Sequence, residues 1–418
     1  MVKINNRLIE ICSKYPTPFY LYDGRSLYDN YHEIRKSLDE SVEIFLSLKA
    51  NNNVSLAKLF AKWGTGVEVA SKGELLLALK AGFSPENIIF SGPGKLEEEL
   101  ELAIREEIYC IIIESLEEAK KVELISSKLG INSNIGIRVN PDCDITNARI
   151  KMAGVPRQFG IDEDDIGEVC SYIKDSSHLV FKGIHVYVGT QILNPDEIVK
   201  SMKYTIELAK HIQETTGFEI TMLNLGGGFG VPYFSHEKPL DIGILMSQVN
   251  GLIYQAKQLF PNARFIVESG RYLLATSGRY IAKAIYKKKS KGEEFIVVDG
   301  GMNHHAASTF RGRTMRNNYP IKVIKKNNNT GDYKTTNIVG PLCTPEDCIA
   351  RSITLPEINV GDYICVENSG AYGLSYSPIL FLGHLPPMEI LVWEGREYVV
   401  RSRGNSDFLL LNQVEVSL

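Results

Sequence analysis

The sequence lacks long hydrophobic runs and a strong excess of either charge. No stretch approaches the roughly 18 uninterrupted apolar residues that a membrane-spanning helix needs, and the N-terminus leads into a polar helical pattern without the apolar segment of a signal peptide. Lysine and arginine total 46 against 50 aspartate and glutamate residues, a net charge of −4, which does not favour nucleic-acid binding. We therefore expect a soluble, cytoplasmic protein whose partners are neither membranes nor nucleic acids.

Cysteine is also scarce, with seven scattered residues among 418. An odd, dispersed set fits free thiols in a reducing compartment better than a disulfide framework. Cys343 and Cys348 form a single C-x4-C pair, but no second pair accompanies them, so two unrelated thiols are the simpler interpretation. The sequence therefore predicts neither a disulfide-stabilised fold nor a metal site.

What the chain does have is a regular alternation of strand-like and helix-like segments from about residue 42 to residue 268. Ser71 with Glu74, and Ser115 with Glu118, are spaced as capping boxes that open helices. Eight such βα repeats predict a closed (β/α)8 barrel of the TIM type, with an open doubly wound sheet as the alternative. The eight expected strands are residues 42–48, 66–70, 87–90, 108–113, 134–139, 181–187, 220–225 and 264–268.

The pattern changes after about residue 277, where helical periodicity largely disappears. Strand-like runs separated by glycine and asparagine turns take its place, so we expect a second domain of mostly antiparallel β structure. Its expected strands are residues 281–286, 295–298, 321–324, 363–366, 390–393 and 398–400. A lysine-rich patch at residues 287–291 is expected to be a solvated loop.

Residues suited to chemistry fall directly after four of the expected barrel strands. They are Lys49 after the first strand, His185 and Tyr187 closing the sixth, glycines 226–228 after the seventh, and Glu268 to Arg271 after the eighth. In a (β/α)8 barrel the carboxyl ends of the strands meet at one rim, which carries the active site. We therefore predict that these four segments form a single site.

Three of these features each have two interpretations. Glycines 226–228 either let a phosphate approach the backbone or simply form a tight turn. Lys49 is either a surface lysine or, desolvated after an almost fully apolar strand, a nucleophile for covalent attachment of a carbonyl compound. Glu268 follows an apolar run and needs a positive partner, which is either a protonated ring nitrogen of a cofactor or an arginine, Arg271 or Arg138.

Taken together, the motifs resemble the fold-type III pyridoxal-phosphate (PLP) decarboxylases, the family of the diaminopimelate, ornithine and arginine decarboxylases. The matching motifs are Leu48-Lys49-Ala50-Asn51, His185-Val-Tyr187-Val-Gly189-Thr190-Gln191, Gly226-Gly-Gly-Phe-Gly230, Glu268-Ser-Gly-Arg271, Gly340-Pro-Leu-Cys343 and Gly370-Ala-Tyr372-Gly373. The resemblance implies a PLP-binding barrel over residues 25–276 and a mostly antiparallel β-barrel domain built from residues 277–418 together with residues 1–24. It also implies a homodimer whose active sites are shared between the subunits.

The resemblance further implies roles for individual residues. Lys49 would bear PLP, Glu268 would pair with its pyridine nitrogen, and Cys343 would return a proton to the substrate after CO2 leaves. Cys343 and Tyr372 would come from the partner subunit. The implied cofactor-binding residues are Lys49, His185, Tyr187, Thr190, Gly227, Gly228, Glu268, Ser269, Gly270, Arg271 and Tyr372. The implied substrate-binding residues are Arg271, Arg316, Tyr319, Thr344, Glu346 and Tyr372.

Two departures from the family pattern narrow the substrate. Tyr187 stands where the decarboxylases carry a histidine against the cofactor ring, and a tyrosine can stack there but cannot carry charge near neutral pH. Thr344 stands where diaminopimelate decarboxylases carry a glutamate that recognises the charged distal end of the substrate. Loss of that charge disfavours substrates with a distal ammonium group, such as diaminopimelate, lysine and ornithine.

Further motifs resemble a subgroup of the family, from antibiotic biosynthesis, that decarboxylates glutamate held through its side chain as a thioester on an acyl-carrier protein and so forms a 4-aminobutyryl thioester. These motifs are Ser47-Leu-Lys-Ala-Asn-Asn-Asn53, Pro156-Arg-Gln-Phe-Gly160, Pro232-Tyr-Phe-Ser-His236, His304-His-Ala-Ala-Ser-Thr-Phe-Arg-Gly-Arg313 and Cys343-Thr-Pro-Glu-Asp347. A neutral distal thioester fits Thr344. We therefore predict a carrier-bound substrate, with decarboxylation of free diaminopimelate, lysine, ornithine or arginine as the alternative.

Other interpretations compete with this one. An amino-acid racemase with the same cofactor would keep Lys49, but the 340–343 segment argues against it. A catalytically silent regulator would not need the full set of site residues. Residues 287–291 are an alternative docking surface for an acidic carrier protein. His304 and His305 are expected to have entrance or loop roles, since they lack further zinc ligands at suitable spacing.

Overall fold

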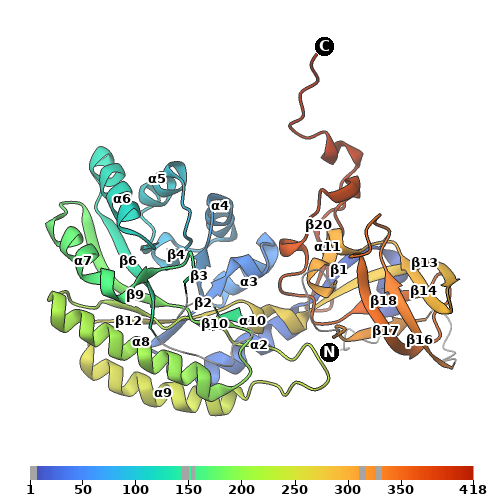
Figure 1. The fold of residues 1–418 in the computed structure, drawn as a ribbon, viewed down its shortest axis with the longest axis horizontal. Coiled ribbons are helices and arrows are strands. Elements are labelled where there is room, and N and C mark those ends of the chain that lie inside the picture. The colour runs from blue at the N-terminus through green and yellow to red at the C-terminus, as the bar shows by residue number, and fades with distance from the viewer. Residues whose placement is uncertain (1–6, 143–149, 152–155, 310–316, 326–331, 418) are drawn as a thin grey trace. The chain divides into compact units, whose positions relative to one another are not determined.

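A computed structural model describes residues 7–142, 150–151, 156–309, 317–325 and 332–417 (Figure 1). The chain divides into two compact units. Asn30–Pro232 and Lys238–Leu273 form the first, called here the barrel unit. Met1–Asp29, Tyr233–Glu237 and Leu274–Leu418 form the second, called here the β unit.

Eight parallel strands close into a ring in the barrel unit. Each pairs with its neighbour in chain order, and β12 pairs back onto β2, with Phe265 opposite Val42. The strands are β2 (Val42–Ser47), β3 (Gly66–Val69), β4 (Ile88–Phe90), β5 (Cys110–Ile113), β6 (Ser133–Asn140), β9 (Leu179–Val186), β11 (Met222–Asn224) and β12 (Arg264–Ser269). The predicted closed barrel is therefore confirmed, all eight expected strands are present, and the open-sheet alternative is wrong.

Helices connect the successive barrel strands, one more helix precedes the first strand and one follows the last, and α8 and α9 lie side by side (Figure 1). The helices are α2 (Gly24–Ser37), α3 (Val54–Lys62), α4 (Lys72–Ala81), α5 (Glu97–Arg105), α6 (Leu116–Leu129), α7 (Ile166–Asp175), α8 (Pro195–Thr216), α9 (Ile242–Leu259) and α10 (Arg271–Leu274). Ser71 Oγ accepts the amide hydrogen of Glu74 at the start of α4. Ser115 Oγ accepts that of Glu118 at the start of α6. Both serines are therefore N-caps, but the predicted capping boxes are incomplete, because Glu74 and Glu118 accept the amide hydrogens of Ala70 and Glu114 instead of those of the capping serines.

Large apolar side chains from opposite strands fill part of the barrel interior. They are Phe45, Ile89, Cys110, Ile112, Met222 and Ile266, all fully buried. A Cβ at Gly66 would lie 2.4 Å from the ring of Phe45, so glycine is required where that ring packs. Because the interior is packed, chemistry in such a barrel is left to the ends of its strands.

Short strands extend the rim of the barrel at its carboxyl end. β8 (Ile161–Asp162) pairs in parallel with the end of β6. β10 (Gly189–Thr190) pairs with β7 (Ile150–Lys151). Thr190, a predicted cofactor-binding residue, therefore lies in this small ribbon.

The β unit contains a nine-stranded, mostly antiparallel sheet, which confirms the expected character of the second domain. Its strands are β1 (Phe19–Asp23), β13 (Gly278–Ser290), β14 (Glu293–Val298), β15 (Ile321–Ile324), β16 (Tyr333–Val339), β17 (Cys348–Pro356), β18 (Tyr363–Val366), β19 (Met388–Trp393) and β20 (Arg396–Arg401). β1 pairs with β13 and β19, so the N-terminal segment is part of this sheet. The short helices α1 (Leu8–Lys14) and α11 (Met302–His305) also belong to this unit.

The lysine-rich patch differs from expectation. Most of it lies in the last residues of β13 rather than in a loop, and only the turn to β14 is irregular. Lys287 lies 3.4 Å from Glu294 and 3.2 Å from Glu357, so part of its charge is neutralised within the sheet. The patch is therefore the exposed end of a strand that pairs with β14, and the run of lysines gave no strand signal in the sequence.

Two general expectations can be compared with the described residues. None of the helices there is both long and apolar enough to span a bilayer. Six described cysteines are free thiols, five of them buried, while Cys343 is exposed. Cys143 lies outside the described residues.

Candidate active site

Lys49 lies at the carboxyl end of β2, in a single 3-10 turn, Leu48–Ala50. Its Nζ atom is 2.8 and 2.9 Å from the two carboxylate oxygens of Glu68, at the carboxyl end of β3. Nζ also lies 5.6 Å from the ring centroid of Tyr187. Glu68 was not among the expected site residues, yet it forms an ion pair with the predicted cofactor-bearing lysine.

The ion pair with Glu68 differs from the environment expected for Lys49, which was either the solvated surface or an apolar, desolvated site. The lysine side chain is 39% exposed, whereas the Glu68 side chain is 2% exposed. Burial of the lysine is therefore modest, and the adjacent carboxylate favours its ammonium form. The ion pair with Glu68 therefore holds the Lys49 side chain in place, and desolvation contributes little.

Glu268 lies on β12 with its side chain 2% exposed. Its Oε1 atom accepts a hydrogen bond from Asn224 Nδ2 at 2.7 Å. Its Oε2 atom is buried and has no hydrogen-bond partner among the described residues. Arg138, one of the two arginines considered as its partner, instead pairs with Glu114 at 3.1 Å. A buried carboxylate oxygen that lacks a donor costs roughly 1–3 kcal/mol or more, which a protonated ring nitrogen would remove.

His185 lies next to Glu268, with Nε2 3.5 Å from Glu268 Oε1, and neither ring nitrogen has a hydrogen bond in the described structure. Burial, assisted by the charge of Arg138, lowers the pKa of His185 to about 3. The ring is therefore neutral at physiological pH. The Tyr187 ring lies 5.6 Å from Lys49 Nζ, within reach of a group bound to that lysine.

Glycines 226–228 are required by protein packing. Gly226 and Gly228 adopt φ values of +66° and +85°. A Cβ at Gly227 would lie 1.9 Å from the carbonyl oxygen of Glu268, and one at Gly228 2.4 Å from that of Gly189. The tight-turn interpretation is therefore sufficient to explain the glycines.

The end of β12 brings the remaining predicted barrel residues to the same rim. Gly270 packs against Ala50, the last residue of the 3-10 turn that carries Lys49, since a Cβ at position 270 would lie 2.8 Å from that of Ala50. Ser269 is buried, and its Oγ has no hydrogen-bond partner among the described residues. Arg271 begins α10. The structure thus brings Lys49 and the 268–271 segment together, as the sequence predicts.

A buried chain of charges on this rim was not expected. Lys95 Nζ lies 2.6 Å from Glu118, with side-chain exposures of 1% and 10%. Glu118 Oε2 accepts the amide hydrogen of Glu114, which pairs with Arg138 and also accepts from the Gly160 amide. Only the capping role of Glu118 is visible in the sequence, because a buried ion pair needs the tertiary structure to be recognised.

In the β unit, Cys343 lies in the turn between β16 and β17, and its side chain is exposed. Thr344 is half-buried, with Oγ1 3.4 Å from the amide nitrogen of Glu346, and Glu346 is exposed. Asp347, which the sequence did not single out, is 3% exposed. The hairpin therefore presents the thiol at the surface of this unit while its aspartate points inward.

Two other predicted residues lie in the β unit. Tyr319 is 6% exposed and packs against Tyr233, with ring centroids 4.8 Å apart. Tyr372 adopts a φ of +55°, uncommon for a residue with a side chain. Arg316, the remaining predicted substrate-binding residue, lies outside the described residues, as do Arg311 and Arg313.

His304 and His305 do not have the loop roles expected of them. Both lie in α11 and are at most 1% exposed. His305 accepts the amide hydrogen of Ser308 through Nδ1, and its Nε2 is 2.9 Å from Ser369 Oγ. Burial lowers the pKa of His304 to about 4. His304 is therefore neutral at physiological pH, and both histidines are buried, hydrogen-bonded residues of the β unit. No metal-binding cluster occurs in the parts of the chain that the structure describes.

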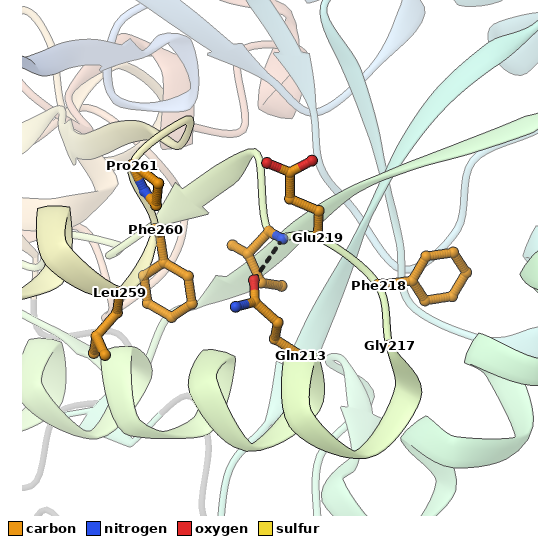
Figure 2. Close-up of a pocket in the computed structure, with 8 residues that line it drawn as sticks. Gln213, Gly217, Phe218, Glu219, Leu259, Phe260 and Pro261 are labelled. Atoms are coloured by element: carbon orange, nitrogen blue, oxygen red, sulfur yellow. Dashed lines mark hydrogen bonds between the residues drawn. The ribbon is translucent and has the colours of Figure 1, made fainter.

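A pocket of about 270 Å³ in the barrel unit lies away from these residues (Figure 2). Its lining precedes β11 and β12, so it is at the amino ends of the strands, opposite the rim that carries Lys49. Gln213 Oε1 accepts the Ile220 amide hydrogen there, as the dashed line in Figure 2 shows. The pocket takes no part in the candidate site.

Comparison with known proteins identifies the family. Residues 25–275 match the family described as "Pyridoxal-dependent decarboxylase, pyridoxal binding domain". The chain is 50% identical over 408 residues to the L-glutamyl-[BtrI acyl-carrier protein] decarboxylase of Niallia circulans, covering 97% of this chain and 95% of that protein. It is 34% identical over 373 residues to a diaminopimelate decarboxylase of Helicobacter pylori, covering 88% of each.

Solved structures agree. The crystal structure of diaminopimelate decarboxylase from Helicobacter pylori complexed with L-lysine superimposes with a TM-score of 0.86 at 30% identity, over 96% of this chain and 98% of that one. The sequence-based assignment to PLP enzymes is thereby confirmed, and PLP is the cofactor of the family. This chain belongs to the family of pyridoxal-dependent decarboxylases.

Proposed function

We propose that this decarboxylase acts on glutamate carried through its side chain as a thioester on an acyl-carrier protein and releases the 4-aminobutyryl thioester. The observation that carries the proposal is the contrast in similarity. Identity reaches 50% over 97% of the chain with a relative named for a glutamyl carrier-protein substrate, against 34% with a diaminopimelate decarboxylase. A shared substrate accounts for that contrast more simply than a shared cofactor, which both relatives use.

The hairpin that carries Cys343 supports the same substrate. Thr344 takes the place of an acidic residue in the resembling decarboxylases, and its hydroxyl faces the amide of Glu346 within its own turn. Glu346 is exposed, and Pro345 separates it from Thr344. A neutral hydroxyl leaves no fixed charge for a distal ammonium group, and a neutral thioester needs none.

The barrel rim fits PLP, and the orphaned Oε2 atom of Glu268 is the observation that tests the fit. Lys49 would bear the cofactor, Glu268 would hold the proton of its ring nitrogen, and Tyr187 would contact its ring. The predicted phosphate-facing residues are Gly227, Gly228, Gly270, Arg271 and Tyr372, and the other predicted cofactor-binding residues are His185, Thr190 and Ser269. When bound, PLP supplies an electron sink for the bond that breaks between Cα and the carboxylate.

The proton that replaces the carboxylate at Cα would come from a residue of the protein. Cys343 presents an exposed thiol, suited to donate one proton to Cα after CO2 has left. We propose that Cys343 and Tyr372 serve the site of a partner subunit in a homodimer, with Arg271, Tyr319 and Arg316 contacting substrate. The free thiols of the described residues support a reducing, cytoplasmic location.

CO2 release by PLP-loaded protein tests the proposal. The substrates compared are free glutamate, diaminopimelate, lysine, ornithine and arginine, and glutamyl thioesters of a carrier-protein phosphopantetheine arm. We expect turnover of the thioester alone, lost in Lys49→Ala and slowed in Cys343→Ala. Cys348→Ala, a buried thiol at the start of β17, is the matched control and should retain activity. Faster turnover of diaminopimelate or another free amino acid would refute the carrier-linked substrate.

A further inference from the structure

The hairpin that presents Cys343 is held by a buried carboxylate. Asp347 Oδ2 accepts the amide hydrogen of Leu342 at 2.8 Å, directly before the cysteine. Its Oδ1 accepts that of Met302, the first residue of α11, at 2.7 Å. Both oxygens of one side chain thus connect the cysteine turn to a second segment of the β unit. Burial raises the pKa of Asp347, and the two amide bonds oppose that rise.

The surrounding backbone is shaped around this carboxylate. A Cβ at Gly301 would lie 2.1 Å from Asp347 Oδ1, and one at Gly340 would lie 2.3 Å from Oδ2. The Gly340 amide also donates to the backbone oxygen of Asp347 at 3.1 Å. The carboxylate of Asp347 therefore fits because positions 301 and 340 are glycines, and a side chain at either position would collide with it.

Apolar packing fixes the same turn from one side. Leu342 forms a buried cluster with Met302 and Ala306. Cys343, by contrast, is exposed, so packing of its own side chain contributes little to its position. The orientation of the thiol must come from the backbone on either side of it, which Asp347 and Leu342 hold.

We infer that Asp347 is a positioning residue for Cys343: its carboxylate fixes the turn from which the thiol reaches the substrate carbon. The inference rests on the proposed role of Cys343 as proton donor. Proton donation requires the donor within hydrogen-bond reach of its target, and a displacement of about 1 Å can cost about 100-fold in rate. Asp347 is not proposed to touch the reacting atoms, and it acts only through the turn that carries Cys343.

Asp347→Asn is the informative substitution because it preserves volume while removing one acceptor. The amide side chain has a single oxygen, so its NH2 group must face the N–H of either Leu342 or Met302. One of the two bonds is lost, and a donor then faces a donor. The matched control is Asp362→Asn, since Asp362 is also buried in the β unit and caps a turn by accepting the Asn359 amide hydrogen at 2.9 Å.

A double-mutant cycle separates positioning from general destabilisation. The PLP-loaded full chain is assayed for kcat and KM as wild type, Asp347→Asn, Cys343→Ala and the double variant. We expect Asp347→Asn to lower kcat about 10- to 100-fold with little change in KM. Added to Cys343→Ala it should lower kcat less than about twofold, because the group it positions is already gone. An equal loss in both backgrounds, or no loss in either, would overturn the inference.

Hydrogen exchange gives a readout that does not depend on turnover. In Asp347→Asn the backbone amides of residues 341–348 and of α11 should exchange faster than in wild type, while peptides of β1 and β18 stay unchanged. Asp362→Asn should leave residues 341–348 unchanged. If the wild-type chain turns over none of the substrates, the proposed function fails, but hydrogen exchange still tests whether Asp347 restrains the turn. Unchanged exchange at residues 341–348 in Asp347→Asn would show that it does not.

Discussion

Substituting Glu68 by glutamine should make Lys49 a faster nucleophile toward the cofactor. Glu68 lies 2.8 and 2.9 Å from Lys49 Nζ and is almost fully buried. Only the neutral amine attacks a carbonyl, so a carboxylate that stabilises the ammonium form opposes attachment. Glutamine keeps the shape of the side chain and removes its charge.

The size of the effect follows from the geometry. Two unit charges at about 3–4 Å attract by roughly 4–6 kcal/mol at an effective dielectric near 20. Because the lysine side chain is 39% exposed, solvent screens most of this attraction. We take about 1–2 kcal/mol as the remaining preference for the ammonium form, between surface and buried pairs. A difference of that size corresponds to about a tenfold change in the rate at which Lys49 attacks the cofactor.

Stopped-flow absorbance after mixing cofactor-free protein with PLP measures the attachment rate. Glu68→Gln should attach PLP about tenfold faster than wild type at pH 7, with the difference disappearing at high pH where both amines are neutral. The matched control is Glu98→Gln, which removes an exposed partner of Lys72 at 2.6 Å in the same unit and should leave the rate unchanged. An equal or slower rate in Glu68→Gln across the pH range would refute the reasoning.

Two further predictions concern stability. Lys95→Met should cost about 3–5 kcal/mol in urea unfolding, because it leaves Glu118 buried without its cation, and adding Glu118→Gln should recover part of the loss; a cost below about 1 kcal/mol would contradict the importance of the buried pair. The pH dependence should contain two opposing contributions. Burial lowers the pKa of His185 from 6.5 to about 3, so its contribution to stability is present above pH 6.5 and is lost on acidification at about 1.4 kcal/mol per pH unit. Burial raises the pKa of Glu74 from 4.5 to about 7, so its contribution is present below pH 4.5 and is lost as pH rises towards 7. Between pH 5 and 6, His185→Gln should therefore make the free energy of unfolding fall more steeply as pH rises. Glu74→Gln should make it fall more steeply as pH decreases. If the pH dependence of the urea midpoint is unchanged in both variants, the two shifted pKa values are wrong.

The barrel could be predicted from the sequence because buried parallel strands are short apolar runs between helices with recognisable caps. The strands that carry Cys343 have no counterpart among the expected ones. β16 begins with exposed Tyr333 and polar residues, and β17 has exposed residues in its middle, so neither shows a continuous apolar run. The motif around Cys343 was therefore recognised without the hairpin that presents it.

The sequence around Glu68 already indicates a buried carboxylate that needs a positive partner. It stands between Val67 and Val69 in a short strand whose other residues are apolar, and all four positions are buried. A carboxylate in such a strand requires a partner, and the carboxyl ends of neighbouring parallel strands lie at one rim. Lys49 follows the neighbouring strand, so the pair could have been inferred. The bond from Met302 to Asp347 could not, because no strand pattern places these two segments side by side. Lys95 lies just before α5 and Glu118 lies in α6, in two successive repeats, and nothing in the sequence marks them as buried against each other.

Gly227 and Glu268 differ in what they reveal about a ligand, although both belong to motifs of the family. Gly227 has a sufficient explanation within the protein, because any side chain would collide with the carbonyl of Glu268. Its presence would be required whether or not a phosphate binds. The Oε2 atom of Glu268 has no such internal explanation: it is buried, charge is costly there, and the described protein atoms offer it no donor. The buried Glu268 oxygen without a donor is therefore a stronger structural argument for the cofactor than Gly227, whose packing against the protein already explains it.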